Sequence, residues 1–189
     1  MKKKLSYLFL IFILTLFVGC TPTQFRMRGP SMEPTIHENE YMIVDPHATP
    51  KRGDIIVFSS PLDQNQLLVK RIIGLPTETI KLEKGEIIIS NDQSPEGTVL
   101  SEDYLPAKSP NGKSENITVP FSAELNNFKL PQDAFFVLGD NRKASSDSRS
   151  CFILSAQKRE DCIKGAIPFY ITKEHIKGLV ISHSPDLSY

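Results

Sequence analysis

The sequence has no excess of charge of either sign. Its 189 residues include 22 lysines and arginines against 22 aspartates and glutamates, so the formal net charge is zero. Proteins that bind nucleic acid neutralise its phosphates with a surplus of basic side chains. Nucleic acid is therefore not expected as a partner. The length fits one modest domain.

The sequence also contains little that could hold a metal. Its four histidines lack the spacing of metal ligands and have no cysteine partners, so we interpret them as ordinary surface or core side chains. We expect neither a metal nor another cofactor. These histidines are His37, His47, His175 and His183.

No long stretch has the period of a helix, and the short apolar runs rich in branched residues predict a mainly β chain. Turn signals such as Asp45-Pro46 and 51–54 separate these runs. The predicted strands include Glu38–Val44, Ile55–Phe58, Leu67–Ile73, Glu86–Ser90 and Ala134–Leu138.

The composition changes between about residues 91 and 131, where serine, proline, asparagine, glycine and charged residues dominate. We interpret this stretch as a small inserted β region without catalytic residues. Residues 21–90 and 132–189 then form the main β domain.

The amino end lacks the roughly 20 apolar residues of a comfortable membrane helix. Its apolar run, 5–19, follows three lysines, which predicts a cytoplasmic amino end and an exported chain after Cys20. Residues 1–20 are either a short single-pass anchor helix or a signal peptide. The ending 16–20 also resembles a bacterial lipobox, in which Cys20 is lipidated. An anchor and a lipidated Cys20 would each hold the protein at a membrane.

Cysteines are few. Beyond the amino-terminal segment only Cys151 and Cys162 remain, and in an oxidising compartment such an isolated pair predicts a disulfide. Two reduced, buried thiols are the alternative.

What the sequence does contain is a serine between two prolines, Ser31 in the stretch 29–35. A serine hydroxyl is a weak nucleophile unless a neighbouring group accepts its proton. Lys70, within an apolar run, is a candidate for that base. A lysine normally titrates near 10.4, but removal from water lowers its pKa. Taken alone, a lysine in an apolar run is more often a strand-edge lysine with a solvated ammonium, so the proposed pair depends on the rest of the chain.

Four motifs, in order, make the chain resemble the type I signal peptidases, the membrane-bound serine proteases that remove signal peptides from exported proteins. S-M-x-P-T matches residues 31–35 and R-G-D-I-x-x-F matches 52–58. K-R-x-x-G-x-P matches 70–76 and G-D-N-R-x-x-S-x-D-S-R matches 139–149. The resemblance implies a fold of antiparallel sheets with a small inserted β region, preceded by one amino-terminal apolar helix.

The resemblance also assigns roles to residues. It implies that Ser31 is the nucleophile, that Lys70 is its base, and that the Ser145 hydroxyl orients the lysine ammonium. It further implies structural roles beside the site, with an ion pair inside the 139–149 loop. The residues concerned are Asp140, Asn141, Arg142, Asp147 and Arg149.

The Ser31 backbone N–H is a candidate donor to the oxyanion of the reaction. Some signal peptidases add a serine hydroxyl two residues upstream of the nucleophile, but Gly29 stands at that position here, so a second donor must come from backbone or water. The substrate is expected to be an extended signal peptide with small residues before the cleaved bond, added to a strand edge. Shallow apolar pockets are predicted at Met32, Leu68 and Val69.

Signal peptides and membrane lipid are thus the expected partners, and a bacterial inner membrane with a periplasmic catalytic domain is the expected location. Two other functions stay open on the sequence, as does a specialised paralogue of the signal peptidases with one or few substrates. One is a conjugation-associated peptidase that matures pilin subunits with the same serine-lysine arrangement. The other is an envelope lipoprotein that keeps the scaffold as a binding module without chemistry. The range of substrates does not follow from the sequence.

Overall fold

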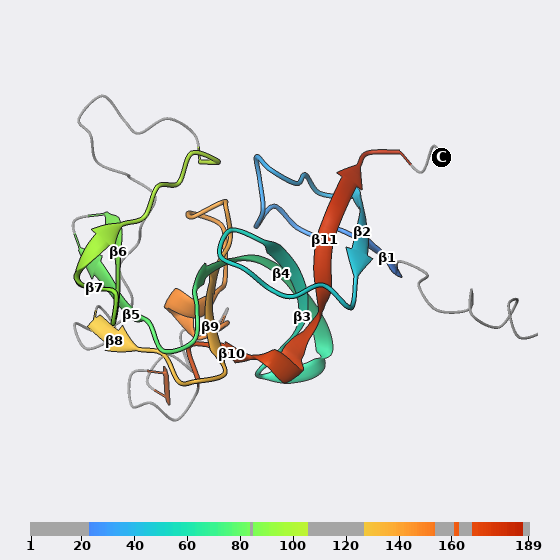
Figure 1. Cartoon of the computed structure of the whole chain (residues 1–189). Coiled ribbons are helices and arrows are strands. Elements are labelled where there is room, and N and C mark those ends of the chain that lie inside the picture. The colour runs from blue at the N-terminus through green and yellow to red at the C-terminus, as the bar shows by residue number, and fades with distance from the viewer. Residues whose placement is uncertain (1–22, 84, 106–126, 154–160, 163–167, 187–189) are drawn as a thin grey trace, which may run out of the picture.

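A computed structural model of the protein describes residues 23–83, 85–105, 127–153, 161–162 and 168–186 (Figure 1). Over these residues the chain forms two antiparallel sheets, which confirms the mainly β prediction. No helix in this described part is long and apolar enough to cross a membrane. The predicted anchor or signal segment, residues 1–20 with Cys20, lies outside the described residues.

The larger sheet has seven strands in the order β1-β2-β11-β3-β4-β9-β10. Its longest strand, β4, is half exposed and half buried, because only its second half has neighbours on both edges. The last strand in sequence, β11, lies between β2 and β3 and so returns the chain to the centre of the sheet. The strands are β1 (Thr23–Arg26), β2 (Tyr41–Asp45), β3 (Ile55–Ser60), β4 (Asp63–Gly74), β9 (Ala134–Leu138), β10 (Ile171–Thr172) and β11 (Ile176–Ser184).

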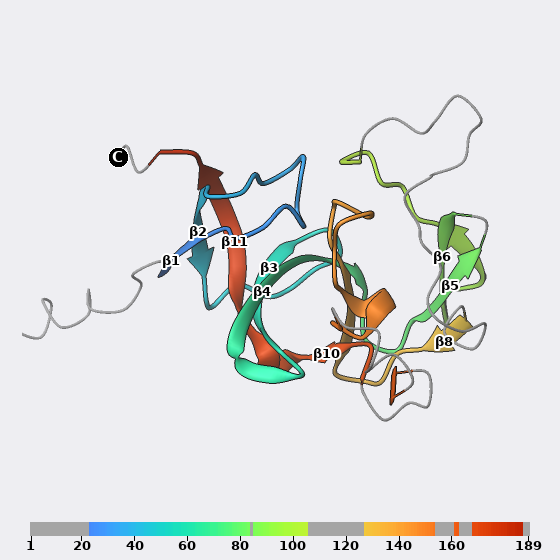
Figure 2. The ribbon, with the colours of Figure 1, turned by 180° about the vertical axis from the view of Figure 1, so that it is seen from behind.

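The smaller sheet has four strands in the order β7-β6-β5-β8 and lies to one side of the larger one in both views (Figures 1 and 2). The hairpin predicted after Glu86 is present as β6 and β7. Two of the four strands, β5 and β6, lie before or end at residue 91, where the composition changes. The predicted domain limits themselves stay a prediction. The strands are β5 (Thr79–Glu83), β6 (Glu86–Asn91), β7 (Ser94–Val99) and β8 (Asn127–Lys129).

The two sheets share one hydrophobic cluster. Alternating apolar residues of β5 and β6 turn one face of the small sheet toward β9, where Ala134, Phe136 and Leu138 are buried. Gly74, at the end of β4, allows this contact: a Cβ there would lie 2.7 Å from Ile80 and 3.0 Å from Phe136. The sequence therefore needs glycine at this position for the sheets to approach.

Other short elements complete the fold. Two 3-10 helices, η2 (Ser148–Ser150) and η4 (Lys173–His175), follow β9 and β10.

The predicted strand Glu38–Val44 begins later than expected, at Tyr41, because the chain turns at Asn39 with a positive φ of 71°. Cys151 and Cys162 are joined by a disulfide, with their Cα atoms 5.9 Å apart.

Candidate active site

Ser31 lies in the turn that follows β1. The loop is closed at its base by backbone hydrogen bonds between Met27 and Glu40 (2.8 Å) and between Asn39 and Met27 (2.9 Å). Met32 and Ile36, four residues apart on one helical turn, are fully buried and fix the loop to the core. Ser31 itself is only partly buried, so its hydroxyl is held in place and remains accessible.

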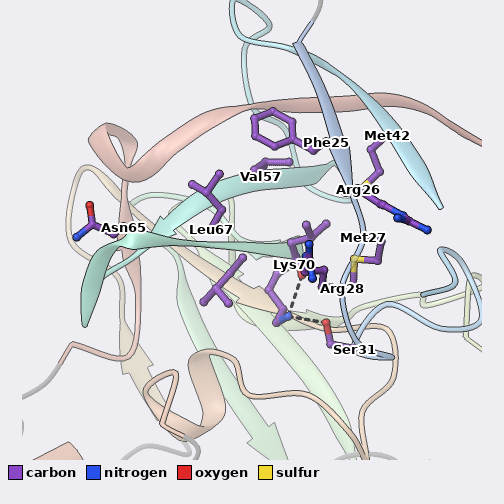
Figure 3. A pocket seen from close by; sticks show the side chains of 12 residues that line it. Phe25, Arg26, Met27, Arg28, Ser31, Met42, Val57, Asn65, Leu67 and Lys70 are labelled. Carbon is purple, nitrogen blue, oxygen red and sulfur yellow. Dashed lines mark hydrogen bonds between the residues drawn. The ribbon is translucent and has the colours of Figure 1, made fainter. Parts of the chain in front are cut away.

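Lys70 lies on β4, opposite Ile56 of β3. It is the last residue of β4 before the pairing with β9 begins at Arg71. Its residue is only 3% exposed. The Nζ atom is 2.8 Å from Ser31 Oγ and donates a second hydrogen bond of 2.8 Å to the Val69 carbonyl (Figure 3). The fold thus brings together two side chains that are 39 residues apart in sequence.

Burial lowers the pKa of Lys70 from 10.5 to about 8, because a charged ammonium loses its hydration in the protein interior. The carboxylates of Asp147 and Asp140 act in the opposite direction, while the Arg149 guanidinium lowers the pKa further. Both hydrogen-bond partners of Nζ are neutral oxygens. Near neutral pH a useful fraction of this amine is therefore uncharged.

The loop after β9, residues 139–149, packs against the turn that holds Ser31, which we call the serine turn (residues 30–36). The Asn141 N–H donates to the Ser31 carbonyl (3.0 Å), and the Asn141 side chain donates to the Pro30 carbonyl (3.1 Å). Gly139 lies so close that a Cβ there would be 2.5 Å from the Ser31 carbonyl oxygen and 2.2 Å from Ser145 Oγ. The glycine at this position thus lets the two loops touch.

Two buried ion pairs fix this loop. Arg71 binds both oxygens of Asp140, at 2.9 and 2.6 Å, and the Thr35 hydroxyl donates to the same carboxylate at 2.5 Å. Asp147 and Arg149 form the second pair, through two hydrogen bonds of 2.9 and 2.8 Å. Because the charged groups are buried, each needs its partner.

Asp147 also accepts a hydrogen bond from the Gly139 N–H at 3.0 Å. Burial alone would raise the pKa of the Asp147 carboxyl, but the Arg149 guanidinium and the Gly139 N–H hold it below its ordinary value. Asp147 is therefore a carboxylate, and its negative charge faces the lysine site.

Ser145 lies at the site but not on the lysine. Its hydroxyl is buried and makes no hydrogen bond of ordinary geometry among the described residues, but it helps to lower the pKa of the Asp147 carboxyl and lies against Gly139 beside the turn that holds Ser31. The predicted hydrogen bond between Ser145 and Lys70 is absent from this arrangement, in which Lys70 donates to Val69 and Ser31 instead. Its proposed role as the lysine-orienting residue stays a prediction.

A cavity of about 360 Å³ adjoins the serine-lysine pair. Of the three predicted pocket residues, Leu68 and Val69 line it and Met32 does not, because the Met32 side chain is fully buried in the core beneath the turn that holds Ser31. Figure 3 shows that the remaining walls come from β1, the residues after it, and neighbouring strands. The lining residues that the sequence did not indicate are Phe25, Arg26, Met27, Arg28, Met42, Val57, Asn65 and Leu67.

Open strand edges border this cavity. Among the strands that the structure describes, β1 pairs with β2 alone, and β9 pairs with β4 from Arg71 onward. Over Leu67–Val69, β4 therefore has no second neighbouring strand among the described elements. The closeness of β1 to Ser31 in sequence was the one signal that could have pointed to its part in the cavity.

Comparisons with known proteins place the chain in a family. The model of the family "Signal peptidase, peptidase S26" matches residues 2–173. A signal peptidase I of Bacillus amyloliquefaciens is 36% identical over 135 residues, which cover 69% of this chain and 67% of that protein. A signal peptidase I of Bacillus licheniformis is 36% identical over 138 residues, covering 70% of this chain and 69% of that protein.

Among solved structures, a signal peptidase I of Enterococcus faecalis is 29% identical, with a TM-score of 0.46. The alignment covers 70% of this chain and 97% of the solved one. The family assignment depends on the match to the family model and on the identity with the Bacillus enzymes. By these two measures, the chain belongs to the signal peptidase family, peptidase S26.

Proposed function

We propose that this protein is a membrane-bound serine endopeptidase that removes signal peptides from exported preproteins, with Ser31 as nucleophile and Lys70 as general base. The observation that carries the proposal is the distance of 2.8 Å between Nζ of the buried Lys70 and Oγ of the partly exposed Ser31. This is hydrogen-bond distance, as proton transfer from a nucleophile to its base requires. Membership of the signal peptidase family supports the substrate class.

In the proposed reaction, neutral Lys70 takes the proton from Ser31 as the Oγ atom attacks the peptide carbonyl. The lysine then gives that proton to the leaving amine, and an acyl-enzyme remains on Ser31. A water molecule, deprotonated by Lys70, attacks the acyl carbon, and the returned proton restores the Ser31 hydroxyl. The amine can serve as acid and base in turn because its pKa lies near 8.

The tetrahedral intermediate carries a negative oxygen that needs hydrogen-bond donors. Among the described residues no oxygen accepts a hydrogen bond from the Ser31 N–H, which leaves this donor free for the oxyanion. Gly29 offers no hydroxyl as a second donor.

We propose that the substrate binds as an extended strand along the open edge of β4. Over Leu67–Val69 the outer edge of β4 has no neighbouring strand among the described elements, although the Val69 carbonyl already accepts a hydrogen bond from Lys70, and Leu68 and Val69 line the cavity. Small side chains before the cleaved bond fit a cavity of about 360 Å³ that also has to hold the peptide backbone.

The decisive experiment incubates the purified full chain with a preprotein and compares it with the Ser31→Ala variant. We expect the native chain to release the mature protein and the variant to release none, with both chains equally folded by circular dichroism. Equal cleavage by both chains would remove Ser31 from the mechanism. Absence of cleavage by the native chain on several preproteins would instead favour a binding module.

The membrane location is part of the proposal. We propose that residues 1–20 anchor the chain in the inner membrane, with the catalytic domain on the periplasmic side, as the three leading lysines favour. Labelling with a radioactive fatty acid separates the two modes of attachment. Label that disappears in a Cys20→Ser variant indicates lipidation, and absence of label indicates an anchor helix.

A further inference from the structure

The segment that leaves the small sheet after β7, residues 100–105, returns to the active site. Its start is fixed to the small sheet, where the Leu100 N–H donates to the Ile87 carbonyl at 2.8 Å. A turn, closed by a hydrogen bond of 2.9 Å from the Leu105 N–H to the Glu102 carbonyl, follows. In both whole-chain views its end approaches the loop after β9 (Figures 1 and 2).

Two side chains of this segment contact two buried arginines. Both Nη atoms of Arg142 donate to the Glu102 carboxylate. The Tyr104 hydroxyl donates to the same carboxylate at 2.6 Å and accepts a hydrogen bond from Arg142 at 3.2 Å. The Tyr104 ring also lies against the Arg71 guanidinium, with Cζ 4.0 Å from the ring centre.

Both arginines act on the loop that holds the serine turn. Arg142 Nε donates to the Gly139 carbonyl at 3.1 Å, and Arg71 binds Asp140 through two hydrogen bonds. The same short stretch, 139–141, holds the Ser31 carbonyl through the Asn141 N–H and the Thr35 hydroxyl through Asp140. A continuous set of contacts thus runs from residues 100–105 to the nucleophile.

We propose that Glu102 and Tyr104 are positioning residues for the Ser31 nucleophile, and this inference rests on the proposed function of the serine-lysine pair. The Arg142 side chain is fully buried, so loss of the Glu102 charge leaves a guanidinium without its carboxylate. The guanidinium regains solvent or another acceptor only by moving, and its Nε is bonded to Gly139. Movement of Gly139 displaces the Ser31 turn from Lys70.

The test compares three substitutions in this segment on the full chain. Glu102→Gln removes the charge at nearly constant volume, and Tyr104→Leu removes the ring over Arg71. Asp103→Asn is the matched control, because Asp103 is exposed between them and its carboxylate contacts only Ser101 among the described residues. We expect kcat for preprotein cleavage to fall about tenfold in the first two variants, with little change in KM, and to stay native in the control.

A conservative variant and a second measurement separate positioning from folding. Tyr104→Phe keeps the ring over Arg71 and should restore most of the kcat lost in Tyr104→Leu. Amide hydrogen exchange of peptides covering residues 30–36 should speed up in Glu102→Gln and Tyr104→Leu but not in Asp103→Asn. Thermal unfolding checks that each variant is folded at the assay temperature.

Native kcat and native exchange in folded Glu102→Gln and Tyr104→Leu would overturn the proposal. Equal losses in Tyr104→Phe and Tyr104→Leu would overturn the contact of the ring with Arg71 and leave the Tyr104 hydroxyl, bonded to Glu102 and Arg142, as the positioning group. Faster exchange at residues 30–36 in a chain whose native and Ser31→Ala forms cleave equally would support the positioning contacts while the proposed nucleophile fails. The two hypotheses therefore fail separately.

Discussion

The two sheets bury different kinds of side chain. In the described strands of the small sheet the buried residues are aliphatic, namely Ile80, Leu82, Ile87 and Ile89. The large sheet and its loops bury charged groups as well, among them Lys70, Arg71, Asp140, Asp147 and Arg149.

Burial of aliphatic side chains stabilises a fold because it removes apolar surface from water. Burial of a charge costs its hydration free energy, which only a hydrogen-bonded partner of opposite charge offsets. The arginines and aspartates of the large sheet are paired, but Lys70 is hydrogen-bonded to neutral oxygens. The large sheet therefore buries one amine, that of Lys70, without a directly bonded carboxylate, and this is the position of the proposed chemistry.

The largest expected effect comes from replacing one lysine in each sheet and comparing the rates of preprotein cleavage. Lys70→Met should lower kcat/KM for preprotein cleavage by about 10⁴-fold or more, because the proposed base is lost. The matched control, Lys81→Met on β5, removes an exposed lysine paired with Glu83 and should leave cleavage unchanged. The measurement is the rate of release of mature protein by the purified variants. Substantial cleavage by folded Lys70→Met would end the role of lysine as base.

The second expected effect is a dependence of activity on pH. Only the uncharged amine accepts a proton, so kcat/KM should fall about tenfold for each pH unit below the Lys70 pKa of about 8 and level off above it. At pH 6 the rate would then be about 100-fold below its plateau. A pH profile measured from 5 to 10 checks this. A flat profile through pH 6 would contradict a lysine base.

The same pKa has a consequence for stability. The folded state releases the Lys70 proton near pH 8, whereas the unfolded chain keeps it to about 10.5, so the unfolded state binds more protons between these values. The free energy of unfolding should therefore rise with pH across this window, by about 3 kcal/mol, through this residue. Lys70→Met should remove that rise, which the difference between the two stability curves would show.

Much of the fold and the site could be predicted from the sequence. The β class followed from short runs of branched apolar residues, and β3, β4, β9 and the β6-β7 hairpin lie where these runs indicated. The closeness of Ser31 and Lys70 followed from the resemblance to signal peptidases rather than from the residues themselves. The sequence around Lys70 does not show which side chains will bury its amine and keep water away from it.

Features that depend on sheet curvature and packing could not be predicted. β5, Thr79–Glu83, belongs to the small sheet although it follows β4 of the large sheet closely in sequence, because sheet membership depends on distant partners. Met32 faces the core rather than the cavity because the serine turn is helical at that point. Its spacing of four residues from Ile36 was the signal that could have shown this.

The fourth prediction compares ion pairs. Asp140→Asn leaves Arg71 buried without its carboxylate and should lower the free energy of unfolding by about 3–5 kcal/mol. Glu83→Gln breaks the exposed pair with Lys81 on the small sheet and should cost less than about 1 kcal/mol. Urea unfolding followed by circular dichroism measures both. Equal losses would mean that Arg71 finds another partner and that burial does not distinguish the two pairs.

The smallest expected effect tests whether the sheets divide stability from activity. Ile56 on β3 and Ile80 on β5 are both fully buried, and Ile→Val at either should lower the free energy of unfolding by about 0.5–1.5 kcal/mol. Ile56 lies directly opposite Lys70, so its lost methylene loosens the dry surroundings of the amine. In urea unfolding the two variants should lose similar stability. Their kcat values should differ, with kcat a few-fold lower only in Ile56→Val. Equal kcat losses would show that packing in the small sheet reaches Lys70 as directly as packing around the lysine itself.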